Sequence, residues 1–326
     1  MIISKTPLRI SFVGGGTDLK AFYQHETGMV ISTAINKYIY IGAHKHFDGS
    51  SFLLKYSEVE EGRDVNTIKN DLIREAMKLV GVTGVEIVSM SDVPAKGTGL
   101  GSSSSFVIGV LNALYAYKGI KKSPEELARD ACKIEIDIIG KPIGKQDQYI
   151  AAYGGLNKIT FHRDDSVEIE KIKMPENKSK ELDSNLMLFY TGRTRSADTI
   201  LKKQKNNTQN KMDSLVKIRN LVDELRSCLN KDELDKFGEL LHRNWVEKRK
   251  LASGITDDAI DMYYEKALSA GALGGKICGA GGGGFLLLYC PQEKQDSVIK
   301  SLTGSLEEMK FNFEPEGSKI IFNNEQ

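Results

Sequence analysis

The segment with the clearest chemical potential is a glycine- and serine-rich run, PAKGTGLGSSSS, at residues 94–105. Alternate glycines let successive backbone N–H groups point inward without obstruction by Cβ atoms, and a helix that begins just after them adds the positive end of its dipole. Such a nest of N–H groups binds phosphate. The hydroxyls of Ser102 and Ser103 can bond phosphate oxygens or complete the oxygen shell of Mg²⁺. The segment is therefore predicted to be a phosphate-binding loop.

Composition alone does not decide this, because a Gly/Ser tract is more often a flexible loop. The order of elements favours phosphate binding, since residues 85–90 are predicted to form a strand and residues 103–117 a helix. The P-loop signature G-x-x-x-x-G-K-[ST] does not occur in the chain, which excludes a P-loop NTPase. A G-x-G-x-x-G pattern occurs at 279–284, but it follows a predicted helix and opens into a predicted strand. A dinucleotide-binding turn needs the opposite order.

Two arginines, Arg193 and Arg195, come just after a predicted strand at 186–190. Their spacing would let paired guanidinium groups bind one phosphate. A role at the surface or between domains is equally compatible with the sequence. Lys96, Lys141 and Lys145 are further candidates for phosphate contact.

The elements that must position these residues follow from the apolar pattern. Residues 2–13 are predicted to form a strand, broken by Pro7, that enters the turn GGGTD at 14–18. Another strand is expected at 31–46. Helices are expected at 68–80, from the SPEE start at Ser123 to Ile139, and along the apolar face Leu215, Ile218, Leu221, Val222 and Leu225.

Length and charge limit the class of protein. A chain of 326 residues is long enough for two domains, and we place the boundary in the polar stretch 163–184, giving domains 1–175 and 176–326. The formal net charge of +1 offers no overall field for nucleic acid or an anionic membrane. Four dispersed cysteines are expected to be buried and reduced, and the N-terminus lacks a signal-peptide core, so a cytoplasmic location is expected.

Three separated motifs, in order, resemble those of the galactokinase, homoserine kinase, mevalonate kinase and phosphomevalonate kinase (GHMP kinase) family. The first is TPLRISFVGGGTD at 6–18, similar to the galactokinase opening, in which an arginine on a strand precedes a turn that holds the sugar. The second is the loop at 94–105. The third, KICGAGGGGF at 276–285, is similar to the glycine tract that closes over the family's active site.

The resemblance implies an α+β, two-domain GHMP kinase fold: an N-terminal domain like domain 2 of ribosomal protein S5 and a ferredoxin-like C-terminal domain. It implies ATP and Mg²⁺, with ATP held by Lys96, Gly97, Gly99, Leu100, Gly101, Ser102, Ser103 and Ser104. Glu135 would ligate the metal with Ser103, Asp147 would orient or deprotonate the acceptor hydroxyl, and Arg9 would stabilise charge near Asp147. Taken alone, each acid would more often be a solvated carboxylate. The substrate-binding residues expected from the resemblance are Gly14, Gly15, Gly16, Thr17, Asp18, Arg193, Arg195, Gly281 and Gly282.

The acceptor is predicted from a difference within the family. Galactokinase has glutamate and histidine where this chain has Gly15 and Gly16, so the pocket would suit a bulkier sugar or one held elsewhere. The GGGTD opening and YTGRTRSA at 190–197 resemble the bacterial branch that phosphorylates the anomeric hydroxyl of D-glycero-D-manno-heptose 7-phosphate. The 1,7-bisphosphate product would supply nucleotide-activated heptose for capsule, lipopolysaccharide or S-layer polysaccharide.

Three alternatives stay open at this point. Another sugar 1-kinase, acting on fucose or a similar unphosphorylated sugar, would leave Arg193 and Arg195 without a phosphate. The mevalonate diphosphate decarboxylase branch shares the fold, but the Thr17-Asp18 turn argues against it. A non-catalytic nucleotide-binding module would not need Glu135 and Asp147. The partners expected are ATP and a sugar phosphate, without nucleic acid or membrane, and a homodimer is left open.

Overall fold

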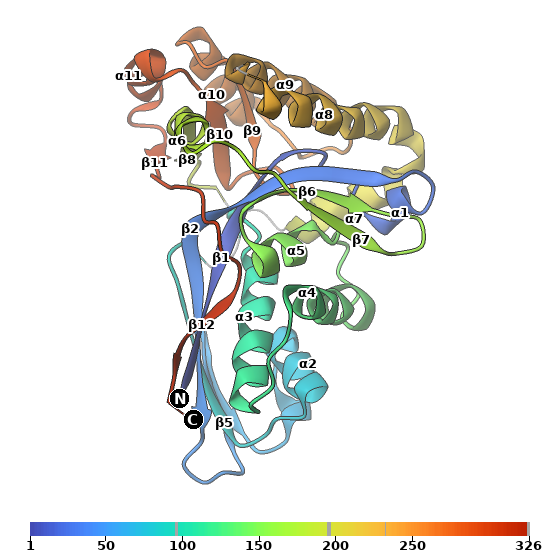
Figure 1. The fold of residues 1–326 in the computed structure, drawn as a ribbon, viewed down its shortest axis with the longest axis vertical. Helices are drawn as coiled ribbons and strands as arrows, with labels where there is room; N and C mark the ends of the chain where they lie inside the picture. The colour runs from blue at the N-terminus through green and yellow to red at the C-terminus, as the bar shows by residue number, and fades with distance from the viewer. Residues whose placement is uncertain (95–96, 194–196, 232, 325–326) are drawn as a thin grey trace.

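The structure is a computed structural model that describes residues 1–94, 97–193, 197–231 and 233–324. It contains an eight-stranded and a four-stranded sheet, each with helices packed on it, as Figure 1 shows. The mixed α+β architecture expected from the sequence is confirmed. No helix in the described part of the chain combines the length and hydropathy that a membrane crossing requires.

The larger sheet has the order β12-β1-β2-β5-β3-β4, with β6 and β7 attached to the other part of β2. Residues 39–45 of β2 pair with β5, whereas residues 28–33 pair with β6, so this long strand joins the two parts of the sheet. Its strands are β1 (Ile2–Val13), β2 (Gly28–Lys45), β3 (Phe52–Lys55), β4 (Val59–Gly62), β5 (Val85–Ser91), β6 (Leu156–Phe161), β7 (Val167–Lys171) and β12 (Lys319–Asn323).

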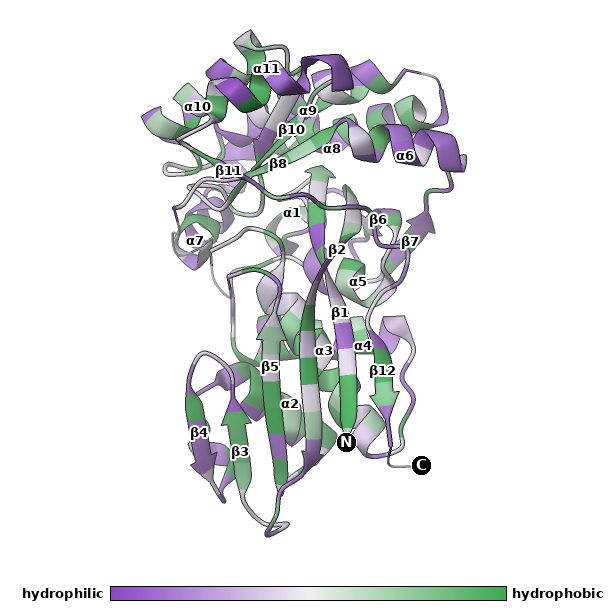
Figure 2. Ribbon diagram, turned by 90° about the vertical axis from the view of Figure 1, so that its left-hand side faces the viewer, coloured by the Kyte–Doolittle hydropathy of each residue, from purple (hydrophilic) through white to green (hydrophobic). Residues whose placement is uncertain are grey.

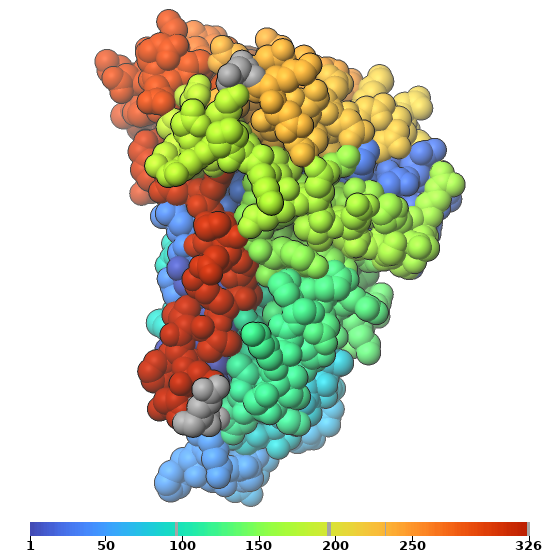
Figure 3. Space-filling model, viewed as in Figure 1, coloured from blue at the N-terminus to red at the C-terminus, as the bar shows by residue number. Residues whose placement is uncertain are grey.

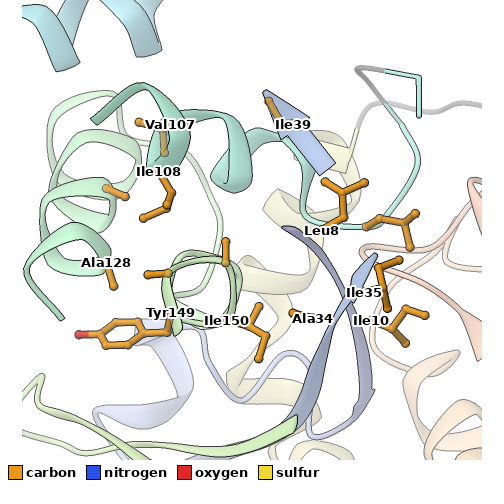
Figure 4. Packing of buried hydrophobic residues seen from close by; sticks show 14 of the residues in the cluster. Leu8, Ile10, Ala34, Ile35, Ile39, Val107, Ile108, Ala128, Tyr149 and Ile150 are labelled. Atoms are coloured by element: carbon orange, nitrogen blue, oxygen red, sulfur yellow. The ribbon is translucent and has the colours of Figure 1, made fainter. Parts of the chain in front are cut away.

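Helices α2 to α5 cover one face of this sheet (Figures 1 and 2). Apolar side chains from β1, β2, α3, α4 and α5 meet there and form part of one continuous buried cluster (Figure 4). The helical elements of this part are α1 (Lys20–Tyr23), η1 (Val65–Thr67), α2 (Asp71–Val80), α3 (Ser102–Tyr117), α4 (Pro124–Cys132), the π-helical turn η2 (Lys133–Ile138) and α5 (Gln146–Tyr153).

The smaller sheet is antiparallel, with the order β11-β8-β10-β9. Its strands are β8 (Leu186–Tyr190), β9 (Gly274–Ile277), β10 (Phe285–Tyr289) and β11 (Glu307–Glu308). The accompanying helices are α6 (Glu176–Ser184), α7 (Ala197–Asn207), η3 (Gln209–Lys211), α8 (Met212–Asn230), α9 (Leu234–Lys248), α10 (Asp258–Ser269) and α11 (Gln292–Leu302). The predicted apolar face of α8 is buried, as expected.

The end of the chain returns to the larger sheet. Strand β12 pairs antiparallel with β1, with Ile2 opposite Asn323, and both termini lie together (Figure 1). In Figure 3 this last segment runs down the side of the molecule from the smaller sheet. The predicted domain boundary after residue 175 stays a prediction, and the larger sheet draws on residues from both ends of the chain.

Two local expectations need correction. Strand β1 continues through Pro7 without a break, and its register with β2 shifts between Pro7 and Leu8, where the proline has no N–H to donate. The glycine tract at 279–284 follows the short strand β9, not a helix as predicted. The tract still opens into strand β10, so a dinucleotide-binding turn remains excluded. The four cysteines are buried and free, as expected.

Candidate active site

A cavity of about 560 Å³ lies where the three sequence motifs meet. Its lining comes from β1 and the turn after it, the loop before α3, the start of α5, the end of α9 and the glycine tract between β9 and β10. The predicted site residues in the lining are Arg9, Gly15, Gly16, Asp18, Gly97, Gly99, Gly101, Ser102, Ser103, Ser104, Glu135, Asp147 and Gly281.

The phosphate loop adopts the conformation that its alternate glycines allow. All three have left-handed backbone angles, with φ of +76°, +75° and +76° at Gly97, Gly99 and Gly101. An L-residue with a Cβ atom rarely adopts this conformation. A Cβ on Gly99 would lie 2.4 Å from the carbonyl oxygen of Cys278, so the loop touches the C-terminal glycine tract directly. The two glycine motifs therefore form one wall of the cavity.

Glu135 lies at the base of this loop, in η2, and is fully buried. Its carboxylate accepts hydrogen bonds from the hydroxyls of Ser103 and Ser104, both at 2.7 Å, and from Nε2 of Gln148 at 2.6 Å. The ammonium group of Lys141 lies 3.2 Å from Oε1 and donates to Ser103 Oγ at 2.8 Å. A buried carboxylate requires this degree of compensation. The predicted pairing of Ser103 with Glu135 is present.

The buried Arg9 and the partly exposed Asp147 form an ion pair on the cavity wall. Nε of Arg9 donates to Oδ1 of Asp147 at 2.7 Å, and Nη2 donates to Oδ2 at 2.6 Å. The remaining terminal nitrogen donates to the Gly99 carbonyl at 2.6 Å, which links the pair to the phosphate loop. Burial opposes the charge of Arg9, but the carboxylate of Asp147 outweighs this effect and raises the pKa of Arg9. The pair is a fixed, bidentate unit.

One part of the GGGTD turn holds the turn together, and another part lines the cavity. Thr17 is buried, and its hydroxyl bonds the carbonyl of Gly14 at 2.8 Å and that of Met29 at 2.9 Å. Asp18 lines the cavity, and its Oδ1 accepts from the backbone N–H of Gly16 at 2.9 Å. Burial, and then the charge of Asp147, raises the pKa of Asp18. The carboxylate of Asp18 therefore lies in the electrostatic field of the Asp147 carboxylate.

The remaining predicted residues lie outside the lining. Gly14 and Thr17 hold the turn, the carbonyl of Leu100 accepts from the Arg9 backbone N–H at 3.0 Å, and Gly282 bonds the Ile255 carbonyl at 2.8 Å. These four contribute to the shape of the cavity and not to its surface.

Of the described basic residues expected to contact phosphate, Lys141 lines the cavity, whereas Arg193 and Lys145 are paired with carboxylates outside the lining. Nη1 of Arg193 contacts both carboxylate oxygens of Asp257, at 3.0 and 2.9 Å, and Arg193 is not part of the described lining. Lys145 binds Asp165 at 3.0 Å. Lys96 and Arg195 fall outside the described residues.

The lining also contains residues to which sequence reasoning assigned no role, among them Ser11, Gln146, Lys248 and Lys276. Lys248 had a detectable signal. It follows the buried Phe237, Leu241 and Trp245 at helical spacing, so a lysine occupies a core-facing position of α9. Ser11 and Gln146 carry no comparable signal.

The oxygen atoms near Glu135 fit a magnesium ion. Within the described residues, no three His, Cys, Asp or Glu side chains gather as a metal cluster. Magnesium in kinases does not need such a cluster, because phosphates and waters supply most of its ligands. The oxygens of Ser103 and Glu135 share the cavity with the phosphate loop, and the ammonium group of Lys141, which contacts both, would give way to the ion. The donor set therefore suits a hard cation.

Comparison with known proteins matches both halves of the chain. The family model for the GHMP kinases N terminal domain matches residues 66–155, and the model for the GHMP kinases C terminal matches residues 225–307. The D-glycero-alpha-D-manno-heptose 7-phosphate kinase of Campylobacter jejuni is 29% identical over 98% of each chain. The galactokinase of Pyrococcus furiosus is 26% identical over 91% of each chain.

Solved structures give the same result. A crystal structure described as a D-glycero-D-manno-heptose 1-phosphate kinase from Bacteroides thetaiotaomicron superposes with a TM-score of 0.83 and 25% identity, over 99% of each chain. The expected GHMP kinase fold is therefore confirmed over nearly the whole chain. Because both family models match the chain and residues from both matched segments line a cavity with a phosphate loop and a fixed carboxylate, the chain belongs to the GHMP kinase family and is an ATP-dependent kinase.

Proposed function

We propose that the chain is a sugar kinase that transfers the γ-phosphoryl group of ATP to the anomeric hydroxyl of D-glycero-D-manno-heptose 7-phosphate. The product would be the 1,7-bisphosphate, for the synthesis of nucleotide-activated heptose and surface polysaccharide. The observation that carries the proposal is the bidentate Arg9–Asp147 pair, which lines the cavity together with the phosphate loop and the GGGTD turn. The similarity to the Campylobacter heptose 7-phosphate kinase, over 98% of both chains, supports the acceptor.

Phosphoryl transfer depends mainly on positioning and on compensation of charge. In this chain the N–H groups of the loop at 97–101 and the start of α3 would bind the ATP phosphates. Ser103 and Glu135 would hold Mg²⁺, which neutralises phosphate charge when bound. These groups lie on the same wall as the Arg9–Asp147 pair, since Arg9 is bonded to Gly99 within the loop.

Asp147 would orient the acceptor hydroxyl and take its proton. Its carboxylate lies at the N-terminal end of α5 with both oxygens bound by Arg9, so its direction is fixed. Arg9 holds the carboxylate in place and would put positive charge beside the transferred group. Asp18, the last residue of the motif that contains Arg9, is also in the lining and would accept hydrogen bonds from sugar hydroxyls.

The acceptor pocket is open at the turn. Gly15 lies in the lining, and the nearest atoms to a Cβ placed on it are Ser11 Oγ at 3.6 Å and Gln146 Nε2 at 3.8 Å. Because Gly15 and Gly16 replace the two side chains of galactokinase, space is available beside Asp147 for a larger sugar. This supports a seven-carbon sugar over galactose.

The test is ADP release with ATP and Mg²⁺, using heptose 7-phosphate, heptose 1-phosphate, unphosphorylated heptose, fucose, galactose and mevalonate as acceptors. We expect efficient turnover with heptose 7-phosphate alone and a product phosphorylated at the anomeric position by NMR. Heptose 1-phosphate is included because the Bacteroides relative is described by that substrate. Turnover confined to an unphosphorylated sugar, or to mevalonate, would overturn the acceptor but not the kinase. ATP binding without turnover would favour the non-catalytic module.

A further inference from the structure

Two lysines at the floor of the cavity lack a carboxylate partner. Lys248 and Lys276 are 5% and 1% exposed, and both line the cavity. Lys276 donates to the backbone carbonyls of Ser11 and Phe12, at 2.6 and 3.2 Å, and Lys248 donates to the carbonyl of Gly279. Neither lysine forms an ion pair with any carboxylate of the described residues. By contrast, the other two cations of the lining, Arg9 and Lys141, are both paired.

Several charged groups lie around Lys248. They are Arg9 on β1, Asp18 after β1, Asp147 on α5, Lys276 on β9 and the Cys278 thiol that follows it. Asp198 of α7 also lines the cavity. Arg9 is committed to Asp147 by its bidentate contact, and no carboxylate of the described residues contacts either lysine directly.

Such an arrangement is unfavourable without an added anion. A buried ammonium group that lacks a counter-charge loses hydration that backbone carbonyls replace only in part. Burial accordingly lowers the pKa of Lys248 to about 8 and that of Lys276 well below its usual value. Nearby, the hydroxyl oxygen of Ser11 is buried and has no hydrogen-bond partner. Buried ammonium groups without a carboxylate partner, next to a hydroxyl group without a hydrogen-bond partner, are what an anion-binding subsite requires.

The position of these lysines favours the acceptor over ATP. Lys276 binds the carbonyls of β1 directly before the GGGTD turn, and Ser11 Oγ lies 3.6 Å from where a Gly15 Cβ would be. The ATP phosphates have their own donors, the backbone N–H groups of the loop before α3. Lys248 bonds Gly279, which adjoins Gly99 of that loop, but its charged neighbours include Asp18 and Asp147, the two carboxylates of the acceptor side.

We propose that Lys248, with Lys276 and Ser11 beside it, binds the phosphate group that the acceptor already carries. The inference rests on the proposed function, in which the acceptor is a sugar phosphate. It assigns to buried lysines the role that the sequence suggested for Arg193 and Arg195, of which Arg193 is engaged with Asp257.

The first test compares Lys248→Met with wild type. Methionine keeps the length of the side chain and removes the charge. Lys250→Met serves as the matched control, because Lys250 lies two residues further on, is half exposed and pairs with Glu247 at 2.7 Å. A hydrogen bond to a charged group contributes about 1.5–3 kcal/mol, so Lys248→Met should raise the KM for heptose 7-phosphate by roughly 10- to 100-fold. The Kd for ATP should change less than about threefold in both variants.

The second test needs no variant and measures proton uptake by calorimetry in buffers of different ionisation enthalpy. Below the lowered pKa of Lys248, about 8, the lysine is already charged when the sugar phosphate binds. Above that pH, binding should take up a proton, and Lys248→Met should reduce this uptake. Inorganic phosphate, as a minimal probe, should compete with heptose 7-phosphate in wild type and compete more weakly in the variant.

The outcomes separate the two proposals. If wild type phosphorylates heptose 7-phosphate and Lys248→Met leaves its KM and proton uptake unchanged, the lysine subsite is wrong. A KM increase in Arg193→Ala/Arg195→Ala, with none in Lys248→Met, would assign the phosphate to the arginines. If wild type turns over only unphosphorylated sugars, the proposed function itself fails, whatever the variants do.

Discussion

Nε and Nη2 of Arg9 each bind a different oxygen of the Asp147 carboxylate, while Nη1 of Arg9 binds the carbonyl of Gly99. One guanidinium group therefore fixes the direction of the proposed base relative to the phosphate loop. A planar fork with donors on three nitrogens can do this, and a lysine cannot. The relationship connects residues 138 and 90 positions apart in sequence.

Asp147→Asn should remove most turnover and leave ATP binding nearly intact. The amide keeps the shape of the side chain but cannot accept the hydroxyl proton, and general-base contributions are about 10²- to 10⁴-fold. ADP release gives kcat, and calorimetry gives the Kd for ATP. Asp213→Asn, an exposed change in the first turn of α8, is the control. Wild-type turnover in Asp147→Asn would show that Asp147 is not the base.

Arg9→Lys should lower kcat by about 10- to 100-fold, because it keeps the charge but loses one of the two bonds to Asp147. A matched control exists in Arg243, whose terminal nitrogens bind Glu224 at 2.5 and 3.1 Å on the surface. Arg243→Lys should have wild-type kinetics, since its ion pair is exposed and remote. Equal kcat values for Arg9→Lys and wild type would argue against an orienting role.

Glu135→Gln should weaken both the metal site and the fold. The carboxylate is fully buried and accepts from Ser103, Ser104 and Gln148, with Lys141 beside it. An amide would present hydrogens to some of these donors and leave the ammonium group unpaired, at a cost of about 3–5 kcal/mol in the free energy of unfolding.

The Mg²⁺ concentration for half-maximal ADP release should rise about tenfold or more in the same variant. Urea denaturation measures the stability change, and the exposed Glu265→Gln is the control for both measurements. Loss of stability without any change in Mg²⁺ dependence would restrict Glu135 to a structural role.

The phosphate loop and its flanking elements were predictable because their signals are local. Strand β5, the alternate glycines and helix α3 follow one another directly, and each is specified by its own residue types. The helix start at Ser123 is also local, and the capping box with Glu126 forms as the sequence indicates.

The features of the fold and the site that could not be predicted from the sequence depend on contacts between residues far apart in the chain. Arg193 resembles a phosphate-binding residue in the sequence, but it pairs with Asp257, 64 residues away. Strand β9 begins with two glycines, which are depleted in strands, and forms because β10 pairs with it. The absence of a carboxylate partner for Lys248 among the described residues becomes visible only once β1, α5 and β9 are placed beside α9.

The two glycines of the acceptor turn should respond differently to alanine. A Cβ on Gly15 has no neighbour closer than 3.6 Å, whereas Gly16 has φ of +102° and its Cβ would lie 2.3 Å from Gln204 Nε2. Gly15→Ala should therefore retain wild-type stability and raise the KM for the acceptor severalfold, since the methyl group enters the cavity.

Gly16→Ala should lower the free energy of unfolding by about 1–3 kcal/mol because of its strained backbone. Thermal denaturation and acceptor KM, measured on both variants, check the pair. An unchanged KM in a stable Gly15→Ala would place the sugar elsewhere in the cavity.

Lys248→Met should stabilise the ligand-free enzyme, and the gain should depend on pH. The lowered pKa of Lys248, about 8, lies below its usual value near 10.5, so the unfolded chain holds a proton between these values that the folded chain has released. The free energy of unfolding of wild type therefore rises as pH increases from about 8 to 10.5. Below pH 8 the buried charge of Lys248 destabilises the folded state to its full extent. The variant lacks the group, so its advantage should be largest at pH 7, on the order of 3 kcal/mol, and should shrink towards pH 10. Urea denaturation of both proteins across this range measures the difference, and a constant difference would show that folding does not lower the pKa of Lys248.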